Sequence, residues 1–413
     1  MSSSLRPTPV TEDLALVLGG GGARGAYQAG VLRYIARQYP HLRIPILVGI
    51  SAGAVNTIHL ASHRGTFQES VEHLVRLWFS LTPERVYRVD ARTLLSNVVR
   101  SGVGLVSGEP GRPDRVRGMV DTAPLRRFLE NALERSTDGT LPGIAGNLAR
   151  GSLNAVALTA TSYTTGQSVT WVQGRSPVLW ERPQRRSEQA LLGVDHVMAS
   201  AALPLLFPAE RVGDEWYGDG GIRLTAPLSP ALHLGASRIL TIATRSSGQQ
   251  SDASDEQKAA YPPPAQVLGT LYNAVFLDLI DQDIVRLNVI NQLISKIPPN
   301  QREGMRLVEI LVIRPSVDLA SLAREYEPQL PSVFRFLTRG LGTKKSASAA
   351  ILSLIMFQED YLRRLVALGE ADGARNHARI ARFIEGETAL PEPEDTEPLD
   401  TLAPHDAHAL DPR

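Results

Sequence analysis

A serine stands between two glycines in the segment Gly49-Ile50-Ser51-Ala52-Gly53. An apolar run at residues 44–48 precedes it, and small residues fill positions 52–61. This order predicts a strand, a sharp turn and a helix, with the serine at the turn. Such a turn pushes the hydroxyl out at a helix N-terminus, where free N–H groups and the helix dipole favour developing negative charge. The pattern therefore indicates an activated nucleophile.

A second segment combines a buried-strand pattern at residues 14–18 with a glycine-rich loop, made of Gly20, Gly21, Gly22, Ala23, Arg24 and Gly25. The spacing matches the dinucleotide fingerprint, which also needs an acidic residue about 20 positions further on. No Asp or Glu occurs between Asp13 and Glu69, which disfavours NAD. The alternative is an oxyanion hole, because glycines let backbone N–H groups converge on one point. Arg24 then anchors an anionic head group, braces the loop, or is a solvated residue at a helix start.

A nucleophilic serine needs a base, and the strongest candidate is Asp219 in Trp216-Tyr217-Gly218-Asp219-Gly220-Gly221. Its glycine neighbours would let the carboxylate reach into a cleft, although Asp-Gly is also a common tight-turn signal. Nine histidines are available, and none lies in a recognisable setting. His59, His63 and His73 are expected at the surface, whereas His196 and His233 lie nearest to the segments of interest.

These elements together resemble the patatin-like phospholipases. That family carries G-G-G-x-R-G, G-x-S-x-G and D-G-G in this order, which correspond here to Gly20–Gly25, Gly49–Gly53 and Asp219-Gly220-Gly221. The segment 199–208 is also similar to the one that precedes the family's aspartate. The resemblance covers residues 12–245 well and extends less surely into the C-terminal part.

The resemblance implies a lipid acyl hydrolase of the phospholipase A or lysophospholipase type. Ser51 would be the nucleophile and Asp219 the base, without a histidine. Backbone amides of Gly21 and Gly22, with a contribution from Ala52, would form the oxyanion hole. The implied reaction is a two-step acyl transfer through an acyl-serine, with no metal and no cofactor. Its substrate would be a phospholipid or lysophospholipid.

The elements around these residues favour an α/β fold. Strands are expected at 14–18, 44–48, 153–161, 168–172, 238–244 and 307–313, and helices between the first two and at 122–133. Alternating strands and helices predict a parallel sheet with helices on its faces. The resemblance implies a three-layer α/β/α sandwich with a mostly parallel sheet.

The chain divides into five expected segments. A disordered N-terminal tail at 1–12 precedes a catalytic domain at 13–245 and a linker at 246–264. A mainly helical C-terminal part at 265–384, with helices at 265–294 and 332–384, completes or packs on the catalytic domain. The tail at 385–413 carries seven acids and no bases between Glu385 and Asp400, and we expect it to be disordered.

Composition limits the classes of partner. The 413 residues carry 43 basic and 43 acidic side chains, so no overall field recruits nucleic acid. There are no cysteines, which excludes disulfides and thiolate catalysis. No apolar run reaches the ~18 residues that span a bilayer, and the start of the chain does not read as a secretory signal. We expect a cytoplasmic protein with peripheral membrane contact.

The segment 85–118 fits such contact, because it has seven arginines against three acids, interleaved with apolar residues. A solvated insertion is the alternative, and a mixed patch at 334–345 has the same two interpretations. Three other functions stay open: an acyltransferase on a related fold, disfavoured by Ile50 where those enzymes usually carry histidine; an NAD enzyme; and a non-catalytic protein that binds lipids or a partner. Head group, acyl position and oligomeric state do not follow from the sequence.

Overall fold

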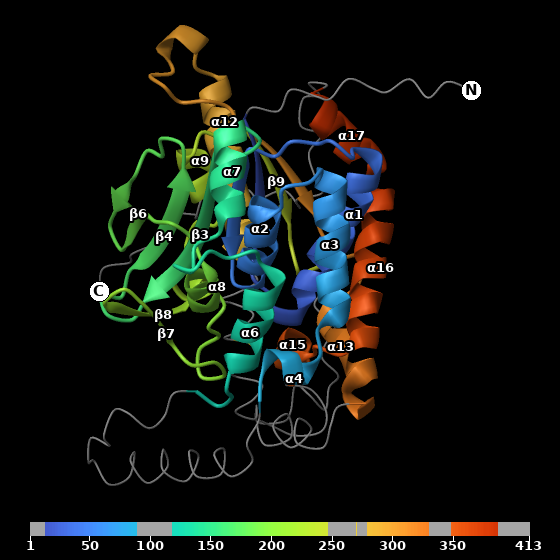
Figure 1. The fold of residues 1–413 in the computed structure, drawn as a ribbon. Coiled ribbons are helices and arrows are strands. Elements are labelled where there is room, and N and C mark those ends of the chain that lie inside the picture. Colours follow the sequence, from blue (N-terminus) through green and yellow to red (C-terminus); the bar gives the residue numbers. More distant parts are fainter. Residues whose placement is uncertain (1–12, 89–117, 247–269, 271–278, 330–347, 387–413) are drawn as a thin grey trace, which may run out of the picture.

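The computed structural model describes residues 13–88, 118–246, 270, 279–329 and 348–386 (Figure 1). The expected N-terminal tail, nearly all of the linker and of the acidic tail, and the mixed patch at 334–345 lie outside the described residues. Of the basic segment 85–118 only the two ends are described. The division of the chain into five segments therefore stays a prediction.

Five parallel strands form the centre of one mixed sheet. They are short and almost entirely apolar, as expected where helices cover both faces. All six predicted strands are present, with ends shifted by at most two residues. In order across the sheet, the parallel strands are β10 (Glu309–Ile313), β9 (Arg238–Ile242), β1 (Leu14–Leu18), β2 (Ile46–Ile50) and β3 (Ala155–Ser162).

The sheet continues beyond β3 through strands that the sequence only partly predicted. β4 is antiparallel to β3, β6 is parallel to β4, and β5 closes this edge. A further hairpin, β7–β8, is attached to the end of β3. The bounds are β4 (Ser168–Gly174), β5 (Glu181–Arg182), β6 (Arg185–Gln189), β7 (Glu210–Val212) and β8 (Glu215–Asp219).

Alternate residues of β1 enter two separate cores. Leu14, Leu16 and Leu18 belong to the larger core, and Ala15 and Val17 belong to the smaller one on the opposite face. This is the period of two that a strand imposes on its side chains. The sheet is therefore the middle layer of three.

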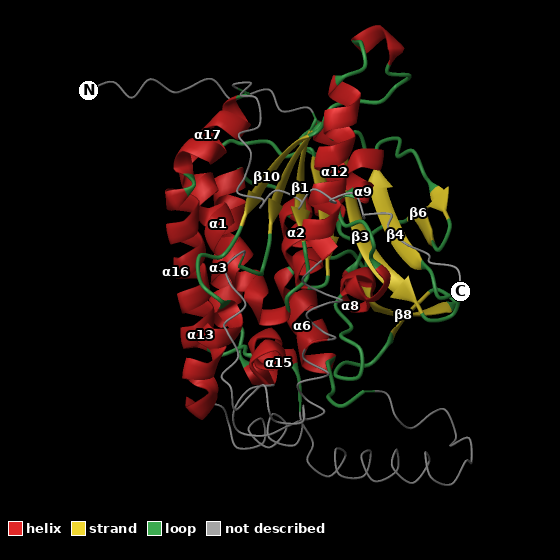
Figure 2. Cartoon of the chain, turned by 180° about the vertical axis from the view of Figure 1, so that it is seen from behind, coloured by secondary structure: helices red, strands yellow, loops and turns green. Residues whose placement is uncertain are grey.

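Helices from both halves of the chain build the outer layers (Figures 1 and 2). Those that supply the larger core are α1 (Gly25–Gln38), α2 (Ala52–Ser62), α3 (Phe67–Ser80), α4 (Pro83–Val86), α6 (Ala123–Ala132), α7 (Pro142–Arg150), α8 (Val194–Ser200), α13 (Leu319–Tyr326), α15 (Ser348–Ile355), α16 (Glu359–Arg375) and α17 (His377–Glu385). The smaller core is covered by α9 (Ser229–His233) and α12 (Leu279–Ser295).

The predicted fold class is confirmed: a three-layer α/β/α sandwich with a mostly parallel sheet and a helical C-terminal part. The strand that precedes Ser51, β2, begins at Ile46 and not at residue 44 as expected. Pro45 has no N–H to donate to a neighbouring strand. Its carbonyl still accepts from the amide of Asn154, at 2.7 Å. Within the described ranges, no helix combines the length and the apolar character needed to cross a bilayer.

Candidate active site

Ser51 occupies the turn that joins β2 to α2. Its φ of 56° and ψ of −126° are unusual for a residue with a side chain. The turn is also crowded, because a Cβ on Gly53 would lie 2.0 Å from the carbonyl oxygen of Leu18 at the end of β1. The predicted strand, turn and helix are thus present, with Ser51 in a strained conformation of the kind found at functional sites.

Ser51 and Asp219 come together because two strands meet end to end along β3. Ile50, the last residue of β2, is opposite Thr159, whereas Asp219, the last residue of β8, is opposite Ala160. β4 occupies the other edge of β3, so β2 and β8 share one edge and converge from opposite directions. The two candidate residues therefore lie at adjacent strand ends.

The neighbouring Gly220 confirms how closely these ends approach. A Cβ there would lie 2.1 Å from the carbonyl oxygen of Thr159 and 3.0 Å from Cγ2 of Ile50. Asp219 ends a strand, and the short 3-10 helix η2 (Gly220–Arg223) follows it. The hairpin turn lies earlier, at Gly213, so Asp219-Gly220 is not the turn of a hairpin.

The carboxyl of Asp219 is completely buried. Its Oδ1 accepts from the amide of Gly221 at 2.9 Å, and among the described residues its Oδ2 has no hydrogen-bond partner. Burial raises the pKa of Asp219 to about 7, and its interactions with the Ser51 hydroxyl and the Gly221 amide lower it only in part. The Ser51 side chain is thus near enough to lower the pKa of this carboxyl. A carboxyl with this pKa can exchange a proton near neutral pH.

Ser200, at the end of α8, is hydrogen-bonded to the backbone of the Ser51 turn. Its hydroxyl accepts from the backbone amide of Ser51 at 3.0 Å and donates to the carbonyl of Thr159 at 2.7 Å. The side chain is fully buried. Ser200 lies in the segment 199–208, which resembles the one before the family's aspartate. Its hydrogen bonds could not be predicted from the sequence, because Ser51 and Thr159 are far away along the chain.

The glycine-rich loop lies directly against Ser51. A Cβ on Gly20 would be 3.1 Å from Cβ of Ser51, and the carbonyl of Gly20 accepts from Oγ1 of Thr244 at 2.8 Å. Gly21 precedes the 3-10 helix η1 (Gly22–Arg24), and its carbonyl accepts from the amide of Arg24. Gly22 has a φ of +54°, and a Cβ on it would lie 2.1 Å from the carbonyl oxygen of Leu354 in α15. The C-terminal part of the chain therefore packs directly on the loop.

A buried polar network fixes the start of this loop. Gln28 donates to the carbonyls of Gly19 and Ile242, at 3.0 and 3.2 Å. Asn56 donates to the side chain of Gln28 at 3.0 Å and accepts from the indole N–H of Trp78 at 2.8 Å. These bonds connect α1, α2 and α3 to the ends of β1 and β9. None of the three side chains was singled out from the sequence.

Arg24 is buried and connects the glycine-rich loop to α15. It is 2% exposed, and its guanidinium donates to Oγ of Ser353 at 2.9 and 2.6 Å and to the carbonyl of Thr244 at 3.4 Å. Burial lowers the pKa of Arg24 from its ordinary value. The expectation of a solvated helix-start arginine is wrong, and an external head group would have to displace these partners.

The histidines that the structure describes do not contact the two candidate residues. His59 was expected at the surface but is 3% exposed, and burial lowers the pKa of His59 to about 3. Of the two histidines nearest to the segments of interest, His196 packs edge-on against Trp171, and His233 stacks on Trp180. Within the described part of the chain, no histidine forms a hydrogen bond with Ser51 or Asp219.

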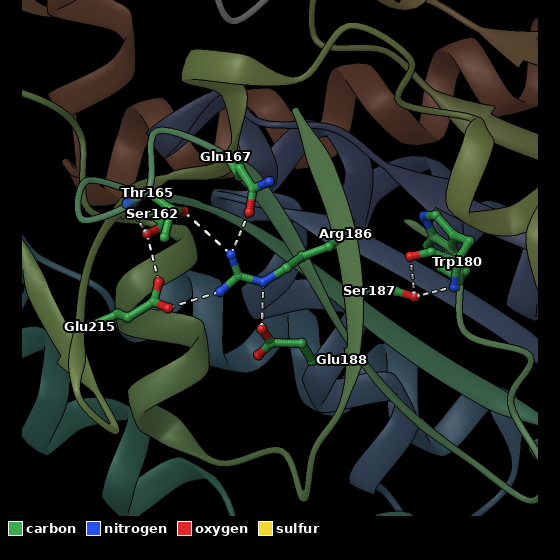
Figure 3. Close-up of polar contacts among 8 residues, drawn as sticks. All are labelled: Ser162, Thr165, Gln167, Trp180, Arg186, Ser187, Glu188 and Glu215. Atoms are coloured by element: carbon green, nitrogen blue, oxygen red, sulfur yellow. Dashed lines mark hydrogen bonds and ion pairs between the residues drawn. The ribbon is translucent and has the colours of Figure 1, made fainter. Parts of the chain in front are cut away.

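The strand that carries Asp219 is anchored by an ionic network at its other end (Figure 3). Arg186 of β6 bonds Glu215, the first residue of β8, at 2.9 Å and Glu188 at 2.6 Å. Glu215 also accepts from the hydroxyl of Ser162 at the end of β3, at 2.6 Å. These contacts hold β8 in register with β3, which fixes where Asp219 meets Ser51.

Metal or cofactor ligands are not evident at this site. Throughout the residues that the structure describes, no three His, Cys, Asp or Glu side chains gather in a way that could hold a metal ion. The glycine-rich loop faces Ser51 and α15, and this arrangement fits an oxyanion hole better than a dinucleotide site.

Comparison with known proteins identifies the family. The model of the family described as patatin-like phospholipase matches residues 16–232, more than half of the chain. No curated protein matches the sequence.

Several solved structures are similar to this chain at low sequence identity. Human GIVD cytosolic phospholipase A2, in complex with methyl gamma-linolenyl fluorophosphonate, is 13% identical with a TM-score of 0.44, over 91% of this chain and 60% of that one. VipD from Legionella pneumophila is 12% identical with a TM-score of 0.31, over 87% and 67% of the two chains. The type III effector protein ExoU is 15% identical with a TM-score of 0.27, over 87% and 54%. Because the family model matches more than half of its residues, the chain belongs to the patatin-like phospholipase family, a family of lipid-ester hydrolases.

Proposed function

We propose that this protein is a lipid acyl hydrolase of the phospholipase A or lysophospholipase type, with Ser51 as nucleophile and Asp219 as its base. One observation carries the proposal: β2 and β8 meet end to end on β3, which brings a strained serine to a buried carboxyl. The family membership supplies the class of substrate, a lipid ester.

In the first step the hydroxyl oxygen of Ser51 attacks the ester carbonyl and its proton passes to the carboxylate of Asp219. We assign this proton to Oδ2, because Oδ1 already accepts from Gly221. The pKa near 7 makes Asp219 a stronger base than an exposed aspartate while leaving it ionised in a large fraction at neutral pH.

The tetrahedral intermediate then carries a negative oxygen. We assign its stabilisation to the backbone amides of Gly21 and Gly22, with Ala52 at the N-terminus of α2 contributing. The loop lies against Ser51, as this role requires. Collapse of the intermediate breaks the bond to the alcohol, which leaves with the proton from Asp219.

In the second step water attacks the acyl-serine. Asp219 accepts a proton from that water and returns it to Ser51 as the fatty acid departs. Both steps transfer only an acyl group and protons, so they need no redox or metal chemistry. We further propose a cytoplasmic enzyme that meets its substrate at a membrane surface.

The test is hydrolysis of a short-chain ester and of phosphatidylcholine vesicles, with products separated as free fatty acid and lysophospholipid. Ser51→Ala and Asp219→Asn should each lower kcat by at least about 100-fold. Two control variants should keep wild-type rates: Ser62→Ala at the far end of α2, and Asp214→Asn in the exposed turn of the β7–β8 hairpin.

The alternatives predict other outcomes. An acyltransferase would pass the acyl group to an added alcohol or lysophospholipid faster than to water. A folded wild-type protein that hydrolyses neither substrate would instead be a lipid-binding or partner-binding relative, and the enzymatic proposal would fail.

A further inference from the structure

Two aromatic side chains are exposed in the described part of the chain, and both lie near the candidate active site. Tyr163 is 48% exposed and Trp216 is 47% exposed. The other large apolar side chains that are exposed there are those of Val, Leu, Ile and Met, and none is aromatic. Because an aromatic ring with a polar tip suits a boundary between water and lipid, this pair indicates an interaction surface.

Strand direction places both residues at the active-site end of the sheet. β3 runs parallel to β2, so its last residue, Ser162, lies at the same edge as Ser51. Tyr163 follows Ser162, and its amide donates to the carbonyl of Trp216 at 2.8 Å. The two residues are thus adjacent along the β3–β8 pair (Figure 1).

The backbone beneath the two aromatics is held rigidly. A Cβ on Gly218 would lie 2.2 Å from the hydroxyl oxygen of Tyr163, so the Tyr163 ring packs over the bare face of β8 immediately before Asp219. The amide of Trp216 donates to the hydroxyl of Thr164 at 3.2 Å. The bonds among Ser162, Glu215 and Arg186 connect the same strands (Figure 3). An exposed ring on a rigid support loses little entropy when it contacts a partner.

A third exposed apolar residue, Leu205, lies in the turn joined to Asp219. It is 67% exposed and has a φ of +67°, which is strained for leucine. Its carbonyl accepts from the amide of Met119, and nearby the carbonyl of Ala202 accepts from the amide of Asp219. The structure thus maintains a strained backbone that presents an apolar side chain to solvent.

We propose that Tyr163, Leu205 and Trp216 form a lipid-contact surface at the active-site end, which seats this end of the molecule on a membrane. The partner is the interfacial region of a phospholipid bilayer, where ester carbonyls lie. The inference rests on the proposed function, because it is this lipid-hydrolase site that the surface would bring to its substrate. The surface is joined to that site through β8, which carries both Trp216 and Asp219.

The chain contains a matched control at the opposite end of the sheet. Met305 is 46% exposed and Leu307 is 41% exposed. They precede β10, whose first residue, Glu309, is opposite Arg238, the first residue of β9, so they lie at the end of the parallel strands away from Ser51. Their substitution also removes exposed apolar area but should leave membrane contact unchanged.

Binding is measured with extruded phosphatidylcholine vesicles, and every variant carries Ser51→Ala so that lipid is not consumed. The Tyr163→Ser/Trp216→Ser variant should lower the partition coefficient at least about tenfold, since two half-exposed rings no longer enter the bilayer. Leu205→Ser should have a smaller effect in the same direction. The Met305→Ser/Leu307→Ser variant should bind as the parent does.

Tryptophan fluorescence reports the contact directly. Of the four tryptophans, Trp78, Trp171 and Trp180 are at most 8% exposed, so a blue shift on adding vesicles would come from Trp216. The shift should be absent in Trp216→Phe. The inference is overturned if vesicles cause no shift, or if the Met305/Leu307 control loses binding to the same extent. Neither result depends on catalysis, which the wild-type short-chain ester assay tests separately.

Discussion

At the scale of single residues, the protonation state of Asp219 controls the proposed chemistry. Burial raises the pKa of Asp219 to about 7, and only the ionised form can accept a proton from Ser51. We therefore predict that kcat/KM falls about tenfold for each pH unit below roughly 7 and reaches a plateau above it. A short soluble ester measured from pH 5 to 9 gives this profile. A flat profile over pH 5–8, with activity still dependent on Ser51, would exclude Asp219 as the base.

The same shift has a consequence for stability. The native pKa of about 7 lies above the unfolded value, so between about pH 4 and pH 7 the native state retains a proton that the unfolded chain has released. The free energy of unfolding should therefore fall as pH rises through this window. Asp219→Asn should remove that slope, which urea unfolding at several pH values would measure; an equal slope in both proteins would contradict the assignment.

Ser200 is expected to act as a positioning residue. Ser200→Ala leaves the amide of Ser51 without its acceptor and the carbonyl of Thr159 without its donor. We predict that kcat falls about 10- to 100-fold while KM and the pH midpoint stay unchanged, because the hydroxyl moves but Asp219 does not. The matched control is Ser70→Ala, a buried serine whose Oγ has no partner among the described residues. Equal losses in both variants would indicate general destabilisation instead.

Motif spacing pointed to the residues to which we assign direct chemical roles, but not to those that position them. Ser51, Asp219 and the glycine-rich loop stand in short patterns whose chemistry can be read from residue type. Ser200 and Gln28 act through hydrogen bonds to residues far away in sequence, and such bonds have no local signature. For Arg24 the sequence allowed both a solvated and a bracing role, and only its burial separates them.

At the scale of elements, the end-to-end meeting of β2 and β8 creates the site. The parallel strands were predictable because apolar runs alternate with helical patterns. The β7–β8 hairpin was not, since Glu210, Arg211 and Glu215 make it look polar in sequence. Its stability comes from the pairing with β3 and from the ion pairs of Arg186, both of which are long-range.

The glycine loop depends on its contact with α15. Gly22→Ala would place a Cβ against the carbonyl of Leu354, in a backbone conformation that alanine disfavours. Gly213→Ala is the matched control, because its φ of +60° is similar but no atom lies within 4 Å of the added Cβ. We predict a loss of about 1 kcal/mol in unfolding free energy for the control, from conformation alone, and a clearly larger loss for Gly22→Ala.

Activity should separate the same two variants. Displacing the loop moves the proposed oxyanion donors, so Gly22→Ala should lose at least about tenfold in kcat while Gly213→Ala keeps its rate. If both variants are equally stable and equally active, the loop does not rest on α15 as the structure shows.

At the scale of the whole molecule, the C-terminal helices share one core with the active-site elements. Tyr27 of α1 donates to Asp372 of α16 at 3.1 Å, and Arg33 pairs with Glu370 at 3.2 Å. Leu365 of α16 is completely buried in the larger core. Strand–helix alternation predicted a parallel sheet with helices on its faces, and the family resemblance implied the three layers. Neither indicates which helices from distant segments pack together.

This shared core predicts a single cooperative unfolding transition. Leu365→Ala should lower the unfolding free energy by about 2–5 kcal/mol, whereas Leu293→Ala, at a 57% exposed position on α12, should change it by less than about 0.5 kcal/mol. Loss of ester hydrolysis and loss of tryptophan fluorescence should follow the same urea curve in both variants. Separate curves would show that α16 and the active site unfold independently.

The most direct test of the account is covalent labelling with a fluorophosphonate, read by intact mass and peptide mapping. The account predicts one adduct, at Ser51, formed at least about 100-fold more slowly in Asp219→Asn and absent in Ser51→Ala. Asp214→Asn, the exposed control on the same hairpin, should label at the wild-type rate. Labelling at another serine, or an unchanged rate in Asp219→Asn, would contradict the proposal that these two strand ends form the catalytic pair.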